Sequence, residues 1–158
     1  MTATLRTRPV RSDRPVGRRG SVLLEAALIL PVLLMLSLGC IEFGYFIHVK
    51  HTLNAAAHFG AREASLDTAT ADSVAAKVQA MMAALGDGDG GALTADDYTV
   101  TITDVTTDTV YTDPADVPAQ NDVRVEVRVE WSTVGFYLTG VMSDGRDVVA
   151  SVVMRKEG

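Results

Sequence analysis

The stretch VLLEAALILPVLLMLSLGCIEFGYFI, residues 22–47, decides how this chain is built, and its only charged residues are Glu25 and Glu42. A helix of these 26 residues would be about 39 Å long, which exceeds the roughly 30 Å hydrocarbon core of a bilayer. Its aliphatic side chains favour insertion by about 4 to 9 kcal/mol, whereas each acid opposes insertion by about 3 kcal/mol at the centre and by less near an end. We therefore predict one membrane-spanning helix with an acid near each boundary.

Charge is divided unevenly between the segment before this helix and the rest of the chain. Residues 1–20 hold six arginines and one aspartate, a net charge of +5, whereas residues 21–158 carry −11. Because basic flanks stay in the cytoplasm, residues 1–20 are predicted to form a basic cytoplasmic leader. The C-terminal part is then expected outside a bacterial cytoplasmic membrane. The acidic body also excludes nucleic acid as a partner, since phosphate binding needs a lysine and arginine surface.

Three other N-terminal signals fit the same residues less well. A cleaved secretory signal has an apolar run of about 7 to 15 residues, which is shorter than this one, although Ala55–Ala57 could serve as a cleavage site. The Arg18–Arg19 pair is compatible with a twin-arginine signal, but Glu25 interrupts the start of the apolar run. Cys40 could be a lipoprotein acylation site, yet the helix stays apolar to Ile47 instead of continuing as a polar tether.

The start of the helix resembles a type IV prepilin processing site. Arg18, Arg19 and Gly20 precede Ser21, and Glu25 is the fifth residue after the Gly20–Ser21 bond. The resemblance implies cleavage of this bond by a prepilin peptidase. It also implies that the carboxylate of Glu25 pairs with the freed Ser21 amine of a neighbouring subunit, and the cost of an acid in an apolar segment agrees with such a partner. The alternative is that Glu25 lies at the cytoplasmic boundary beside the two arginines.

The longer stretch from residue 20 to about residue 66 resembles the TadE family of pilin-like subunits in tight-adherence (Flp) pilus systems. The matching features are Glu25–Ala26, Pro31, Ile41–Gly44, Asn54–Ala56 and Gly60–Arg62. The resemblance implies a structural subunit of Flp, type IV pilus assembly. Its implied partners are a prepilin peptidase, other pilin-like subunits, the pilus assembly platform and the lipid bilayer.

Two departures from the pilin pattern bear on the kind of subunit. Ser21 stands where major type IV pilins commonly have an aromatic residue, and Ala26 stands where Flp major pilins have tyrosine. The C-terminal part is also large and acidic, whereas Flp major pilins are very short. These features favour a minor pilin-like subunit, a pseudopilin, over the main filament subunit.

The helix is predicted to extend beyond the membrane, so that residues 21–66 form one transmembrane and extended helix. Ala56, Gly60 and Ala64 recur at four-residue spacing and would let a second helix approach closely. Other pilin-like helices and the chain's own outer domain are both possible partners for this surface. Pro31 and Glu42 are further candidate packing positions, and Pro31 is expected to remove one hydrogen bond and bend the helix.

Residues 67–158 are predicted to form an extracytoplasmic α+β domain. A helix is expected at 71–85, with Gly86 as its C-cap. Strands are expected at 98–103, 109–112, 122–131 and 147–154. Alternation of valines with charged residues in 122–131 indicates an antiparallel sheet with one solvated face, whereas 147–154 is apolar on both faces and is predicted to be more central. The fold class expected is therefore a long N-terminal transmembrane helix followed by a small antiparallel-sheet domain with one additional helix.

No catalytic constellation is recognisable, so we predict a protein that is not an enzyme and that needs no cofactor. His48, His51 and His58 approach one face of the helix, but no cysteine or acid completes a zinc ligand set, and no metal site is predicted. The glycine- and aspartate-rich loop at 86–97 leaves calcium open as an alternative to a solvated turn. The alternative function is an unprocessed single-pass membrane protein whose acidic outer domain binds an envelope ligand.

Overall fold

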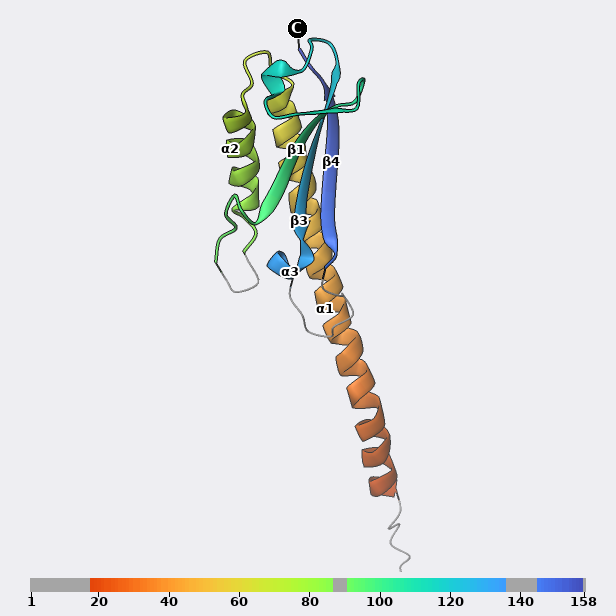
Figure 1. The fold of residues 1–158 in the computed structure, drawn as a ribbon. Coiled ribbons are helices and arrows are strands. Elements are labelled where there is room, and N and C mark those ends of the chain that lie inside the picture. Colours follow the sequence, from red (N-terminus) through yellow and green to blue (C-terminus); the bar gives the residue numbers. More distant parts are fainter. Residues whose placement is uncertain (1–17, 87–90, 136–144, 158) are drawn as a thin grey trace, which may run out of the picture. The chain divides into compact units, whose positions relative to one another are not determined.

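The computed structural model describes residues 18–86, 91–135 and 145–157, and it confirms the predicted α+β class (Figure 1). The helices are α1 (Arg18–Ala64), α2 (Ala71–Met82), α3 (Trp131–Val134) and a short 3-10 helix (Pro114–Asp116). The strands are β1 (Tyr98–Asp104), β2 (Thr109–Tyr111), β3 (Asp122–Glu130) and β4 (Asp147–Arg155). They form one antiparallel sheet in the order β2-β1-β3-β4.

Two compact units divide the chain, residues 1–37 and residues 38–158. Helix α1 contributes residues to both units. The division expected at residue 66 follows the end of this helix, whereas the second compact unit already includes its residues 38–64. The second unit therefore includes residues that the sequence pattern assigned to the transmembrane and extended helix.

The core of the second unit lies between the sheet and the two longer helices. Strand β3 alternates as its sequence predicts, because its four valines are buried while Arg128 and Glu130 are exposed. Helix α1 covers this face with Val49, Leu53 and a row of small residues, all with no exposed surface. Helix α2 packs beside α1 on the same core and contributes three buried residues, Val74, Val78 and Met82.

Helix α2 begins at a capping box and ends earlier than predicted. The Ser73 N–H donates to the Thr70 hydroxyl oxygen, and the Thr70 N–H donates to the Ser73 hydroxyl oxygen, both at 3.2 Å. The prediction that Gly86 caps the other end is wrong, because the helix ends at Met82 with Ala83 as C-cap. A tighter turn follows, in which the Leu85 N–H donates to the Met82 carbonyl at 2.9 Å and the Leu85 side chain enters the core.

Strand β4 is an edge strand, so the prediction that residues 147–154 form a central strand is wrong. Val148 and Ala150 are buried, whereas Val153 on the opposite face is 46% exposed. The valines here reflect the fit of β-branched side chains to a pleated surface and not burial on both faces. Lys50 on α1 donates its ammonium to the Val149 carbonyl, which places a charge beside the edge and discourages pairing with other chains.

A buried carboxylate fixes the loops at the end of the sheet where β1 meets β2. Asp104 is fully buried and accepts hydrogen bonds from the Thr106 N–H (2.8 Å), the Thr107 hydroxyl (3.0 Å) and the Asn121 side-chain amide (2.7 Å). Burial by itself raises the pKa of Asp104, but these hydrogen bonds to the charged form outweigh burial and lower the pKa below its ordinary value. Asp104 therefore joins the β1–β2 turn to the start of β3 as an ionised acceptor.

Candidate functional site

The predicted processing residues lie in the first turns of α1, within the unit formed by residues 1–37. The helix begins at Arg18, so the Gly20–Ser21 bond is part of its N-terminal end. Gly20, Ser21 and Glu25 are all exposed, and a β-carbon added to Gly20 would meet no atom within 4 Å.

The stretch of α1 that follows exposes its apolar side chains. From Val22 to Leu36 every side chain is exposed, including Pro31, which lies inside the helix. Among the described residues, this is the one helix that is long and apolar enough to cross a membrane. Such a surface would be costly in water, and it is consistent with a single-pass membrane protein.

Glu42 lies in the second unit, and its environment differs from that of Glu25. Only 2% of its surface is exposed. The sequence placed this acid near a membrane boundary, and the structure adds that protein covers it. A carboxylate buried in this way avoids contact with lipid, so the helix can be apolar up to this point without presenting a charge to the bilayer.

The small residues Ala56, Gly60 and Ala64 are buried inside the second unit. A β-carbon on Gly60 would lie 2.9 Å from Cγ2 of Val78 on α2 and 3.2 Å from Cγ1 of Val125 on β3. This row is therefore covered by the chain's own α2 and sheet. Of the two partners that the sequence allowed, the chain's own α2 and sheet lie against Gly60.

The positions considered for metals do not gather in the structure. His48, His51 and His58 are exposed, and His48 and His58 lie against Tyr45 and Phe59 with ring centroids 6.2 and 6.0 Å apart. No group of three or more potential metal ligands is found among the described residues. Four residues of the suspected calcium loop, 87–90, lie outside the described part.

Asp97, at the end of that loop, is already engaged. One of its carboxylate oxygens accepts from the Thr94 N–H at 2.6 Å and from the Thr94 hydroxyl at 2.7 Å. These bonds to the hydroxyl and the backbone lower the pKa of Asp97 below its ordinary value. They close a local turn between Thr94 and Asp97.

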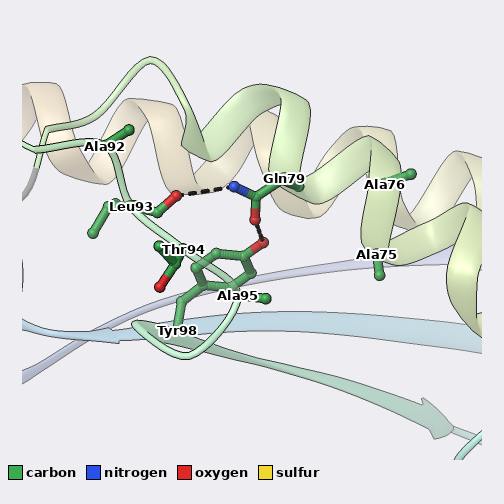
Figure 2. A pocket seen from close by; sticks show the side chains of 8 residues that line it. All are labelled: Ala75, Ala76, Gln79, Ala92, Leu93, Thr94, Ala95 and Tyr98. Carbon is green, nitrogen blue, oxygen red and sulfur yellow. Dashed lines mark hydrogen bonds between the residues drawn. The ribbon is translucent and has the colours of Figure 1, made fainter.

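A shallow hollow of about 430 Å³ lies between α2 and the segment that leads into β1 (Figure 2). The Gln79 side chain crosses it, donating to the Leu93 carbonyl at 2.9 Å and accepting from the Tyr98 hydroxyl. Burial raises the pKa of Tyr98, so this phenol stays protonated as a donor. The side chains of Gln79 and Tyr98 thus bond within the hollow, and its remaining lining is mainly alanine.

Residues 20–62 match the family described as TadE-like protein, and the match begins at Gly20. Over this segment the chain is similar to the TadE-like family. The TadE-like segment runs through both compact units, because it contains Glu25 in the first and Glu42 and Gly60 in the second. TadE-like proteins are pilin-like and generally not enzymes. No curated protein and no solved structure matches the chain.

Sequence reasoning missed one cluster, in which Trp131 of α3 packs against α1. The indole lies 5.6 Å from the ring of Phe46, edge to face, and 6.1 Å from the ring of Tyr45. The predicted strand 122–131 ended on this tryptophan, but β3 stops at Glu130 and Trp131 begins a helical turn. The signal was present as the end of the valine alternation, yet nothing in the sequence paired Trp131 with residues 45 and 46.

Proposed function

We propose that this TadE-like protein is a minor pilin-like subunit of tight-adherence pilus assembly, anchored by α1 and processed between Gly20 and Ser21. The observation that carries the proposal is that the family match begins at Gly20, where the predicted processing site lies. The exposed Gly20–Ser21 bond supports access by a peptidase. The subunit works through assembly contacts and carries out no reaction of its own.

Glu25 has a defined role in this proposal. After cleavage the Ser21 amine becomes a cation four residues before an acid that is otherwise costly in an apolar helix. Pairing the amine of one subunit with Glu25 of another neutralises both charges and sets the register of the two helices. The exposure of Glu25 in the single chain leaves its carboxylate available for this contact.

The leader and the domain after α1 then have separate tasks. The arginine-rich residues 1–20 hold the N-terminus in the cytoplasm until processing. The acidic domain lies outside the membrane and contacts other subunits or the assembly platform. Because the surface of Ala56, Gly60 and Ala64 is already filled by this domain, contacts with neighbouring helices are expected along the exposed part of α1.

Mass spectrometry of the full-length protein, co-expressed with a prepilin peptidase and extracted from membranes, tests the proposal. The wild type and Glu25→Gln are expected to begin at Ser21, whereas Gly20→Phe should keep its leader. Gly39→Phe is the matched control and should be processed normally, because Gly39 lies on the same helix and a β-carbon added there would also meet no atom within 4 Å. An intact wild-type leader beside an active peptidase would favour the alternative, an unprocessed membrane protein with a binding domain.

A further inference from the structure

We propose that one end of the second unit lies in the phospholipid headgroup layer. This is the end at which α1 continues into its apolar stretch. This surface, the aromatic foot, consists of Phe43, Tyr45, Phe46, Trp131 and Arg146. The exposed ring of Phe43 occupies the interface, the buried Trp131 lies at the same depth, and Arg146 binds lipid phosphate. The inference requires α1 to span a bilayer, but it does not depend on processing or on pilus assembly.

The length of the apolar stretch places the foot at the boundary. The residues from Val22 to Ile41 form a helix of about 30 Å, which matches the hydrocarbon core of a bilayer. The next residue is Glu42, which the protein buries instead of exposing to lipid. Each headgroup layer adds roughly 5 to 8 Å, or about three to five helical residues, so the layer after Ile41 extends as far as Phe46.

Aromatic contacts bring a distant part of the chain to the same depth. Trp131 lies beside Phe46 and Tyr45 at ring distances of 5.6 and 6.1 Å, and the Phe43 and Phe46 rings are 6.4 Å apart. Phe43 itself is 60% exposed. Tryptophan and tyrosine prefer the membrane interface because their rings are apolar at one end and polar at the other.

The indole of Trp131 supplies an independent observation. Its Nε1–H is buried and has no hydrogen-bond partner within the part of the chain that the structure describes. Buried tryptophan N–H groups usually find an acceptor. A cavity of about 200 Å³ lies beside the indole and is lined also by Phe46 and Arg146.

Arg146 gives the foot a positive charge. Its backbone carbonyl accepts from the Trp131 N–H at 2.7 Å, which holds residue 146 next to the indole. The neighbouring acid, Asp147, is engaged at 2.8 Å by Arg128. The exposed guanidinium of Arg146 can therefore bind a phosphodiester through paired N–H donors.

The fluorescence of Trp131 reads its depth directly, because it is the chain's single tryptophan. The full-length protein would be reconstituted in vesicles of phosphatidylcholine and phosphatidylglycerol whose acyl chains are brominated either near the ester or near the methyl end. We expect strong quenching by the shallow bromines and weak quenching by the deep ones. Absence of quenching by both lipids, or stronger quenching by the deep one, in protein that resists alkaline extraction would overturn the proposal.

A first pair of variants distinguishes a change in the depth of the aromatic foot from a general effect on folding. Phe43→Asp is expected to reduce shallow quenching by roughly half, because a charge at the boundary is expelled toward water. Phe59→Asp changes a half-exposed phenylalanine farther along the same helix and should leave quenching unchanged. Equal quenching in Phe43→Asp and the wild type would contradict the proposed depth.

The role of Arg146 has its own comparison. Arg146→Glu should weaken shallow quenching in vesicles that contain phosphatidylglycerol, whereas Arg155→Glu, at the opposite end of β4, should not. An unchanged signal in Arg146→Glu would remove lipid phosphate from the proposal. None of these measurements involves the peptidase. A negative result here would therefore not contradict the pilin-like function, and an unprocessed leader would not contradict the position of the aromatic foot.

Discussion

Asp104 shows how a single buried acid can organise the loops of this small domain. Its three hydrogen bonds come from the turn after β1 and from the residue before β3. The carboxylate is fully buried, so each bond replaces one that water would otherwise make. Removing the negative charge of Asp104 would leave the donors of Thr106, Thr107 and Asn121 without an acceptor of equal strength.

Replacing Asp104 with asparagine is expected to lower the free energy of unfolding at neutral pH, with a pH dependence that identifies the cause. Because the folded pKa of Asp104 is lowered, the stabilisation is present above the unfolded pKa of about 3.9 and is lost as the pH falls through the folded pKa. Urea unfolding of wild type and Asp104→Asn should therefore differ at pH 7 and converge in acid.

The matched control for this titration is Asp67→Asn, at an exposed site in the turn after α1. It should unfold like the wild type at both pH values. A constant difference between Asp104→Asn and the wild type down to pH 2 would show that geometry, and not ionisation, is what Asp104 contributes.

At the scale of elements, the contact of α1 with α2 and β3 depends on a residue without a side chain. Gly60 lies against both other elements, and a β-carbon there would lie 2.9 Å from Val78 of α2 and 3.2 Å from Val125 of β3. Gly60→Ala is expected to destabilise the domain by about 1 to 3 kcal/mol, because the valine must move in a filled core. Chemical denaturation of the two proteins measures this difference.

Gly44→Ala provides the comparison for Gly60→Ala within the same helix. Gly44 is exposed and has no neighbour within 4 Å of an added β-carbon. Alanine there should leave stability unchanged or raise it by about 0.5 to 1 kcal/mol through helix propensity. If Gly60→Ala were as stable as Gly44→Ala, close packing of α1 on α2 would not be a source of stability.

The elements themselves were largely predictable, because their signals are local. The valine alternation in β3 and the capping residues before α2 depend on neighbours a few positions apart. The edge position of β4 could not be predicted in this way, since its valines satisfy strand propensity in any position of a sheet. The contact of Trp131 with Phe46 could not be predicted from local sequence either, because these residues are 85 positions apart.

The predicted processing site and the packing surface of α1 also differ in how much their local sequence reveals. Gly20 and Glu25 were recognisable as a pattern of consecutive residues. The row of Ala56, Gly60 and Ala64 revealed that something packs closely against α1, but small residues carry no information about what the partner is. Only the three-dimensional arrangement shows α2 and β3 in that place.

For the whole molecule, the helix that carries the apolar span also supplies the core of the domain. Six α1 residues between Val49 and Ala64 are fully buried. Burial of Val49 and Leu53 alone contributes about 3 to 6 kcal/mol, which is comparable to the total stability of about 5 to 15 kcal/mol for a typical domain. The domain therefore cannot be separated from α1 at the point where the helix ends.

Two truncated chains test this dependence. A chain that begins at Gly44 retains all six buried α1 residues and is expected to unfold cooperatively in urea. A chain that begins at Asp67 lacks them and should show no cooperative transition and poor dispersion of its amide NMR signals. Leu53→Ala in the longer chain gives a graded comparison, since an empty space at a fully buried leucine costs about 2 to 5 kcal/mol. A cooperative transition in the shorter chain would mean that the sheet and α2 form a core without α1, so that the helix serves only as an anchor.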